Sequence, residues 1–387
     1  MAAKKAKPRT RRAARKDYTD FAHTGPGTLA GRFLRSFWQP VYLASDIKPG
    51  FAKPLHIMND RFTLYRGQGG KPHLIDFRCP HRGEQLSVGW VVEDNLQCLY
   101  HGWTFDGTGQ CVDQPAEPKP FCHKVKIKGY PTEEYLGLIF AYLGEGEAPP
   151  LPRYPHFEGE GVLQVDTYTR DCNYFNNLDN DPVHVYFVHR NSPFDRAGLD
   201  TIPDRIWAEE CPFGATFYTQ MPGRPVRSVQ RGMPNIIHFK GSPNPVNGTW
   251  TDHLSWRVPI DDATHASFNI NLVHVTGEAA EKYRRRQAED AAKKQRVREL
   301  AQAVLRGELR IADIDENEVN IVNVQDEVSQ AGQGVIADRS NERLGHTDVP
   351  VILFRKLWER ELRALAEGKP LRRWHWTEEL VATSGVA

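Results

Sequence analysis

The stretch of sequence that decides the fold is Cys79-Pro80-His81-Arg82-Gly83, followed by Cys98-Leu99-Tyr100-His101-Gly102-Trp103. Each segment supplies one cysteine and one histidine, and sixteen residues separate His81 from Cys98. A short apolar run leads into each segment, at residues 74–77 and 96–99, and predicts a strand that opens into a loop. The two loops therefore offer two thiolates and two imidazoles to one metal centre.

This donor set suits a 2Fe–2S cluster of the Rieske kind, in which cysteines hold one iron and histidines hold the other. A structural zinc site is the alternative, but zinc loops usually open with two cysteines about two to four residues apart. Gly83 and Gly102 suit tight loops whose backbone N–H groups point at cluster sulfurs. The sequence thus predicts a Rieske centre, and electron transfer as the first function, with these ligands: Cys79, His81, Cys98 and His101.

The length and composition of the chain call for more than an electron carrier. A Rieske module takes roughly a hundred residues of the 387, so a second domain is expected. No apolar stretch approaches the length of a membrane span and no secretory signal is visible, which predicts a cytoplasmic protein. The four remaining cysteines are scattered, as is typical of buried thiols rather than of a disulfide framework. They are Cys111, Cys122, Cys172 and Cys211.

The first residues of the chain are strongly basic. Eight lysines and arginines precede Asp17, while the net charge of the whole chain is only +1. We interpret residues 1–25 as a disordered, solubilising tail. A nucleic-acid-binding or targeting signal is the alternative interpretation.

The rest of the chain predicts two domains. Residues 28–37 predict a short helix, closed by residues 38–40, and short β-rich runs between Gly, Pro and Asp follow up to residue 143. We assign residues 26–155 to an all-β Rieske domain, with the boundary after the loop at 144–150. Residues 156–387 form the second domain, with alternating runs that predict an antiparallel sheet and with helices at 278–305 and 349–367. The predicted fold class is an all-β Rieske domain plus an α+β catalytic domain, an antiparallel sheet with covering helices.

A second candidate metal site lies around His184 and His189, five residues apart. On an ideal α-helix five residues turn about 500°, so the two rings diverge by about 140° unless the helix ends or widens between them. Two imidazoles and one carboxylate form the ligand set of non-haem Fe(II) oxygenases, with positions left for O₂. Asp181, three residues before His184, shares its face. Asp326 is the favoured carboxylate among several acids between residues 313 and 327.

Together these residues resemble the Rieske non-haem iron oxygenases. The likeness is to the catalytic α subunits of aromatic ring-hydroxylating and O-demethylating systems, the phthalate dioxygenase-like group, and it runs from about residue 25 onward. Both cluster loops match, and the family's Asp-x-x-His-x-x-x-x-His motif matches at Asp181, His184 and His189. The family's late aspartate ligand matches Asp326. Asn177 takes the place of an asparagine that related proteins often have near the iron.

The resemblance implies a terminal oxygenase component that activates O₂ at a mononuclear Fe(II) held by His184, His189 and Asp326. A separate reductase, with or without a ferredoxin, would supply the electrons, so that NAD(P)H acts only indirectly. A ring of three subunits would place one chain's cluster beside the iron of the next. Asp181 would then bridge His184 and His101 of the partner subunit.

The expected substrate is aromatic, an aromatic acid in particular, and the expected reaction is mono- or dihydroxylation of its ring. Oxidative O- or N-demethylation of a methoxylated aromatic or biaryl compound is the alternative, and a Rieske electron carrier with a binding domain is a remote one. We expect an apolar channel to the iron. Candidates to orient a polar group of the substrate are Arg224, Arg227, Asn235 and His238.

Overall fold

The computed structural model describes residues 18–180, 182–189, 192, 202–223, 225–243, 250–293, 296–316 and 319–377. The first seventeen residues of the basic tail, Asp181 and Arg224 lie outside the described residues. Among the helices of the described ranges, none combines the length and the apolar character needed to cross a membrane.

The N-terminal part of the chain is all-β after one short helix, α1 (Leu29–Arg35). Its strands pair antiparallel in three sheets of order β1-β11-β10, β2-β3-β4-β9 and β5-β6-β7-β8. The strands are β1 (Trp38–Leu43), β2 (Ala52–Ile57), β3 (Asp60–Arg66), β4 (Pro72–Asp76), β5 (Trp90–Val92), β6 (Asn95–Gln97), β7 (Thr104–Phe105), β8 (Cys111–Asp113), β9 (Gly129–Tyr130), β10 (Thr132–Tyr135) and β11 (Leu138–Tyr142). The predicted strands before both cluster loops are therefore present, as β4 and β6.

One local prediction in this region is wrong. Residues 38–40 do not close the first helix, because the helix ends at Arg35 and β1 begins at Trp38. Trp38 pairs with Tyr142 of β11, a strand whose residues are all buried. The apolar residues of β1 thus bury more surface by pairing with a core strand than they would by extending the helix.

The C-terminal part is α+β, as predicted. A seven-stranded antiparallel sheet has the order β12-β18-β17-β16-β15-β14-β13. Its strands are β12 (Val162–Arg170), β13 (Arg205–Cys211), β14 (Gly214–Gln220), β15 (Arg227–Gly232), β16 (Ile236–Pro243), β17 (Trp250–Pro259) and β18 (His265–Val273). The helices are α2 (Tyr174–Leu178), α3 (His184–Val188), α5 (Gly277–Lys293), α6 (Val297–Leu305), α7 (Ile321–Ala331) and α8 (Val349–Ala366).

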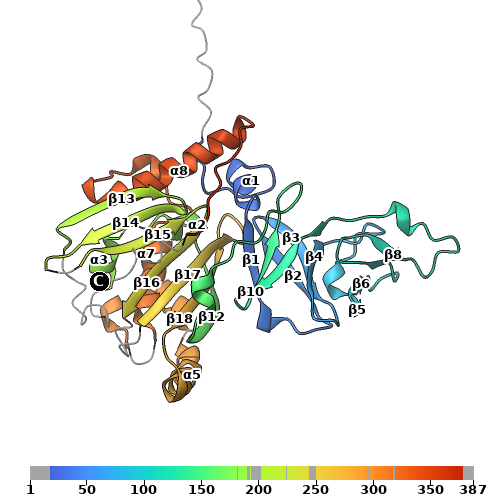
Figure 1. Cartoon of the computed structure of the whole chain (residues 1–387), viewed down its shortest axis with the longest axis horizontal. Coiled ribbons are helices and arrows are strands. Elements are labelled where there is room, and N and C mark those ends of the chain that lie inside the picture. The colour runs from blue at the N-terminus through green and yellow to red at the C-terminus, as the bar shows by residue number, and fades with distance from the viewer. Residues whose placement is uncertain are drawn as a thin grey trace, which may run out of the picture.

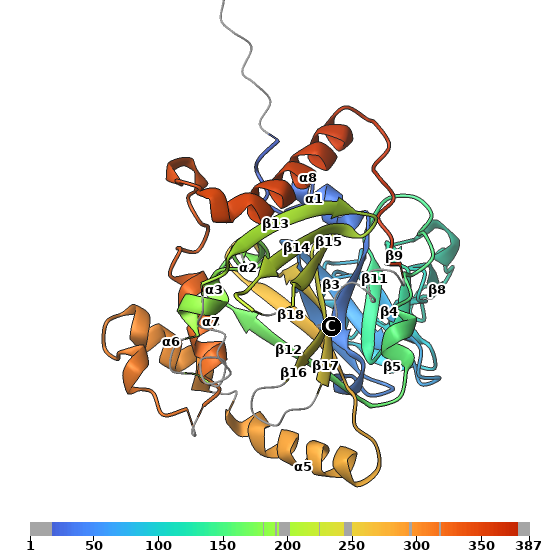
Figure 2. The ribbon, with the colours of Figure 1, turned by 60° about the vertical axis from the view of Figure 1, so that its left-hand side comes forward.

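The two parts lie at opposite ends of an elongated molecule (Figure 1). Helix α8 packs on β13, β14 and α1, and it buries Phe354, Trp358 and Leu362. Helices α3, α6 and α7 gather on another side of the large sheet, where α7 packs against both of the others (Figure 2). The sheet is therefore the platform that positions α3 and α7.

Two further predictions need correction. Residues 278–305 do not form one helix but two, α5 and α6, and α6 turns its apolar face to α7 around the buried Ala301. Residues 18–25 were assigned to a disordered tail, yet Phe21 is buried and stacks on Phe175 with ring centroids 4.8 Å apart. The Tyr174 hydroxyl donates to the Phe21 carbonyl at 2.6 Å. This segment packs through the rings of Tyr18 and Phe21, and it carries none of the lysines and arginines that precede it.

Candidate metal centres

The two cluster loops are built by glycines that allow a tight return of the chain. The Gly83 N–H donates to the Cys79 carbonyl at 2.9 Å, and the Gly102 N–H donates to the Cys98 carbonyl at 3.0 Å. Both glycines have positive φ, 76° and 75°, which L-residues with side chains adopt only with strain. In each loop the tight turn therefore places the cysteine side chain and the following histidine side chain on the same side of the loop.

The four predicted cluster ligands come together in space. Cys79 and Cys98 are each 2% exposed, and the rings of His81 and His101 lie with centroids 4.4 Å apart. Trp103 stacks on the His81 ring at 4.5 Å with an interplanar angle of 4°, which fixes the imidazole. The structure thus brings two buried thiols and two neighbouring imidazoles to one end of the β region.

The chemistry of this donor set fits a 2Fe–2S cluster. Burial raises the pKa of the Cys79 thiol to about 11, and the nearby Cys98 adds to the effect, so a thiolate forms there only with a cation beside it. The buried His81 Nδ1 has no hydrogen-bond partner in the described part of the chain. A polar atom buried without a partner is costly, and a metal bond removes that cost.

The second candidate site rests on the end of a helix. Helix α3 runs from His184 to Val188, and His189 has already left helical geometry, with φ −91° and ψ 29°. This is the helix ending that the five-residue spacing required. The rings of His184 and His189 consequently face a common region, with centroids 5.8 Å apart and an interplanar angle of 71°.

Asp326 joins the two histidines from α7, which packs against α3. One donor atom each from His184, His189 and Asp326 lies within 4.8 Å of the others. His189 Nε2 and Asp326 Oδ1 are 3.5 Å apart, and this buried Oδ1 makes no hydrogen bond with a described residue. Such a separation is too long for a good hydrogen bond and is close to that of two ligands on one metal ion. The donor set therefore fits a divalent iron.

Two residues that the sequence analysis did not single out, Gln325 and Arg170, lie beside this site. Gln325, 1% exposed, accepts a hydrogen bond from His189 Nδ1 at 3.1 Å, which leaves Nε2 as the ligand atom. Arg170 lies buried with Nη2 3.7 Å from Asp326 Oδ2, and its Nε donates to Glu327 at 3.1 Å. Only the packing of β12 and α3 on α7 reveals these contacts, since nothing in the local sequence distinguishes these side chains.

Asn177 and Asp179 have different surroundings. Asn177 is buried, donates from Nδ2 to His265 Nε2 at 3.1 Å and accepts from Arg257 Nε at 3.0 Å. Burial lowers the pKa of His265 to about 3, so its imidazole is neutral and Nε2 can accept. Asp179 instead forms an ion pair with Arg355. These two hydrogen bonds fix the orientation of the Asn177 amide, while Asp179 links α2 to α8 through its ion pair.

A cavity of about 610 Å³ adjoins the three donors of the second site. Phe217 and Phe239 contribute to its apolar lining, and many polar side chains share the wall with them. Polar lining residues include Arg227, Arg231, His253 and Asn271. Burial lowers the pKa of His253 to about 4, so this imidazole is neutral.

The other residues proposed for the cavity lie elsewhere. The Asn235 amide donates to Gln39 and to the Arg257 carbonyl in the core, and His238 Nδ1 donates to Gln230. Phe187, which lies in α3 between the two histidines, is 47% exposed and does not line the cavity. Strand alternation explains the error for Asn235 and His238, because the sequence does not show which face of a two-sided buried sheet meets the cavity.

Comparison with known families finds one domain in the N-terminal part of the chain. Residues 37–132 match the Rieske [2Fe-2S] domain, and this range contains all four cysteine and histidine residues of the two loops.

Curated proteins match over most of the chain. The oxygenase subunit of 5,5'-dehydrodivanillate O-demethylase from Sphingobium sp. is 31% identical over 371 residues, which cover 90% of this chain and 80% of that protein. The α subunit of phenoxybenzoate dioxygenase from Ectopseudomonas oleovorans is 32% identical over 268 residues, 62% of this chain and 64% of that protein.

Solved structures share the fold. The oxygenase of carbazole 1,9a-dioxygenase, in complex with its ferredoxin, aligns with a TM-score of 0.64 at 22% identity, covering 94% of both chains. NdmA of Pseudomonas putida, in a variant bound to theobromine, aligns with a TM-score of 0.63 at 20% identity, covering 87% of this chain and 92% of that one.

Proposed function

The chain belongs to the family of Rieske non-haem iron oxygenase α subunits, and from this premise we propose that it oxidises an aromatic acid at an iron held by His184, His189 and Asp326. The observation that carries the proposal is the meeting of these three donors within 4.8 Å at the wall of a cavity of about 610 Å³. The family makes the chain an oxidoreductase that uses a 2Fe–2S cluster, a mononuclear iron and O₂.

The chain's own residues prepare this site for the metal. Gln325 holds the His189 ring so that Nε2 faces Asp326, and Arg170 places a positive charge beside the same carboxylate. An Fe(II) held there by two imidazoles and one carboxylate would supply the activation of O₂. The neutral His253, whose ring nitrogens contact Asn271 and Ser255, and the oriented Asn177 are polar but uncharged parts of the wall.

Arg227 is the side chain that supports an acidic substrate. It lines the cavity, and its pKa is lowered by desolvation, so the charged guanidinium is poorly compensated there. A substrate carboxylate would supply that compensation through paired hydrogen bonds. The related protein named a phenoxybenzoate dioxygenase carries an acid in its substrate name, which agrees with this assignment.

The Arg227→Gln variant tests the carboxylate contact. We expect KM for an aromatic acid to rise about 10- to 100-fold with little change in kcat. The reason is that a hydrogen bond between charged groups contributes roughly 1.5–3 kcal/mol to binding. The exposed Arg205→Gln serves as a matched control and should keep the wild-type KM. Wild-type discrimination between an acid and its methyl ester should vanish in Arg227→Gln, and its persistence would contradict the role of Arg227.

Ring hydroxylation is the primary reaction proposed, and O-demethylation is a second candidate that a specific observation favours. The O-demethylase subunit from Sphingobium sp. covers 90% of this chain. The two reactions share the same iron chemistry and differ in which carbon the cavity presents to it. Release of formaldehyde from a methoxylated acid would assign demethylation, and a phenol or diol without formaldehyde would assign attack on the ring.

An electron-transfer protein is the expected partner, since a related oxygenase forms a complex with ferredoxin. We also propose an α₃ ring in the cytoplasm, in which Asp181 bridges neighbouring iron sites. Support comes from large exposed apolar side chains near the cluster loops: Trp90 is 62%, Leu99 50% and Tyr100 53% exposed. A head-to-tail contact that closes at three would cover such a surface. Light scattering should give three times the 44.1 kDa of one chain.

The central experiment combines metal analysis with turnover. The purified protein is supplied with a ferredoxin and reductase from a related system and with a panel of benzoate, methoxybenzoate and biaryl acids. About three irons per chain and oxygenated product are expected. About two irons per chain with no product on any acid would favour an electron carrier and overturn the proposal.

A further inference from the structure

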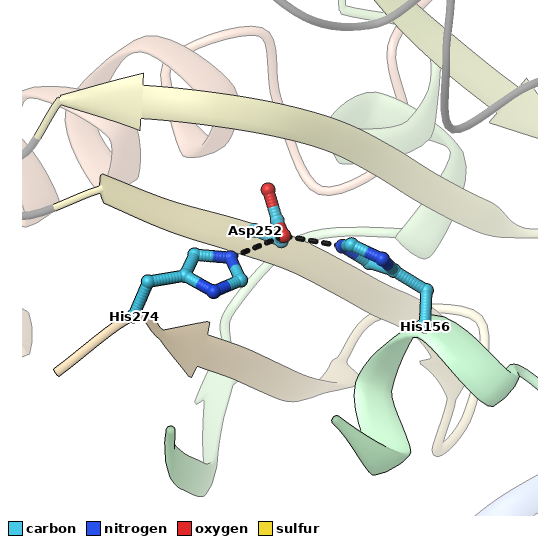
Figure 3. Close-up of side chains that lie close together, drawn as sticks. All are labelled: His156, Asp252 and His274. Atoms are coloured by element: carbon cyan, nitrogen blue, oxygen red, sulfur yellow. Dashed lines mark hydrogen bonds and ion pairs between the residues drawn. The ribbon is translucent and has the colours of Figure 1, made fainter. Parts of the chain in front are cut away.

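The geometry points to a second divalent metal site, formed by His156, Asp252 and His274. His156 lies in the short 3₁₀ helix Pro155–Glu158, Asp252 in β17, and His274 directly after β18. One donor atom of each residue lies within 4.8 Å of the others. Figure 3 shows both imidazoles pointing at the same carboxylate from opposite sides. We propose that these three side chains bind Zn²⁺.

The sheet register brings two of the ligands together. Asp252 pairs with Leu272 across β17 and β18, and His274 follows Leu272 by two residues. Paired residues and residues two apart share one face, so Asp252 and His274 are diagonal neighbours on that face. His253, the next residue of β17, lines the catalytic cavity on the other face. The proposed site is therefore separate from the mononuclear iron site.

The burial of the three residues suits a site that an ion can reach. Asp252 is 1% exposed, whereas the side chains of His156 and His274 are 22% and 39% exposed. A buried carboxylate is stable only with compensating partners, and both histidines direct Nε2 to its Oδ2. The buried acid supplies the negative charge, and the half-exposed imidazoles leave the outer side open to solvent.

Two imidazole nitrogens and one carboxylate oxygen are a ligand set that Zn²⁺ prefers, with water in the fourth position. Without an ion the residues form a hydrogen-bonded triad, in which His274 Nε2 lies 2.6 Å from Asp252 Oδ2 and His156 Nε2 is also in hydrogen-bond contact. Zinc bonds of about 2.0–2.2 Å in a tetrahedron would lengthen each N···O separation by roughly 1 Å and would bring the two Nε2 atoms, which now approach Oδ2 from opposite sides, closer together. The partly exposed histidines can make that adjustment by small side-chain rotations.

The position of His156 indicates what the ion would do. The 3₁₀ helix begins beside the buried Tyr154 and contains the buried Phe157, where the chain leaves the N-terminal β region for the large sheet. A zinc ion would tie this crossing segment to the ends of β17 and β18. The expected consequence is greater stability, with no direct part in oxygen chemistry.

The test uses the iron-loaded protein, zinc and three variants. After equilibration with micromolar Zn²⁺ and removal of free ion, metal analysis of the wild type should give one zinc per chain with iron content unchanged. Asp252→Asn and His274→Ala should each weaken zinc binding by at least about tenfold, since each loses a ligand. His23→Ala is the control, because His23 forms an exposed pair with Asp20 at 2.9 Å, and among the described residues this pair belongs to no group of three possible ligands. It should bind zinc as the wild type does.

A thermal shift gives an independent readout. Zinc at about 100 times its Kd should raise the Tm of the wild type and of His23→Ala by about 3–5 °C. Asp252→Asn and His274→Ala should show no such rise, and His274→Ala, which removes a half-exposed ring, keeps the test usable if Asp252→Asn is unstable. No bound zinc, equal binding in all variants, or zinc gained only as iron is lost would each overturn the proposal. The first result would leave a hydrogen-bonded triad, and the last would place zinc in the iron site.

Discussion

The two proposed iron sites of this chain are built in opposite ways. The cluster ligands come from two loops whose shape is set within five or six residues, each closed by a glycine with positive φ. The mononuclear site depends on α3 meeting α7, and its hydrogen bond from His189 to Gln325 spans 136 residues of sequence. The geometry of the first site is therefore set by short stretches of sequence, and that of the second by the packing of helices that are distant in the sequence. A mutation at one site should therefore leave the metal content of the other site unchanged.

The largest effect is expected from His189→Ala. The change removes one of three proposed ligands and leaves the buried Gln325 oxygen without this partner, so the mononuclear iron should be lost and turnover should fall by at least about 10³-fold. The cluster should stay intact, because its loops share no residue with α3 or α7. Iron analysis should fall from three to two per chain while the cluster keeps its visible absorption and its EPR signal. Loss of the cluster as well would show that the two sites are not independent.

The next effect tests the proposed link between the two sites. Asp181→Asn should leave three irons per chain but reduce turnover by about 10²-fold, because the carboxylate that would connect His184 to His101 of the partner subunit loses its charge and an acceptor. The measurement is the rate at which a reduced cluster is oxidised during a single turnover.

Asp179→Asn provides the contrast to Asp181→Asn. Asp179 is paired with Arg339 at 3.1 Å and with Arg355, so its loss should lower the free energy of unfolding by about 2–4 kcal/mol. The electron-transfer rate should not change. A slow rate in Asp179→Asn, or a normal rate in Asp181→Asn, would contradict the assignment of the bridge to Asp181.

The same difference between the two sites explains what the sequence could predict. The proposed cluster ligands follow from residue type and spacing alone, since a cysteine, a histidine two or three residues later and then a glycine define each loop. The helix ending at His189 also follows, because five residues of ideal helix cannot direct two rings to one ion.

Other features needed the three-dimensional structure. Asp326 could be selected among neighbouring acids only by resemblance, because the choice depends on how α7 packs on α3. Gln325 and Arg170 carry no local signal at all, since their roles arise from contacts between distant elements. The same holds for His156, Asp252 and His274, which three separate elements bring to one point. The polar part of the cavity wall was not predicted, because the sequence does not show which face of the sheet lines the cavity.

A smaller effect should follow from a change beside a ligand. Gln325→Leu removes the acceptor for His189 Nδ1, so the imidazole loses its orientation, and iron affinity or turnover should fall about 10-fold. Gln325→Glu keeps an acceptor oxygen and should restore most of the loss. Gln333→Leu, an exposed change just beyond the same helix, is the control and should have no effect. If both leucine variants lose iron equally, the cause would be helix stability rather than the bond to His189.

The smallest effect is expected from a substitution in one of the two cluster loops. Gly102→Ala places a Cβ 2.8 Å from Pro115 Cγ on a residue with φ 75°, so both backbone strain and a side-chain contact oppose it. We expect a loss of about 1–2 kcal/mol in unfolding free energy. Cluster content per chain should fall with it, because the loop that presents Cys98 and His101 must shift.

Gly146→Ala is the matched control for Gly102→Ala. Gly146 has a similar φ of 79°, but an added Cβ would meet no atom within 4 Å. Gly146→Ala should lower the unfolding free energy only by the amount due to backbone strain, and it should keep its full cluster content. Chemical unfolding gives the energies, and visible absorption against protein concentration gives cluster content. If Gly102→Ala lost mononuclear iron instead of cluster, the loop would be coupled to the distant site and the separation between local and packed sites would fail.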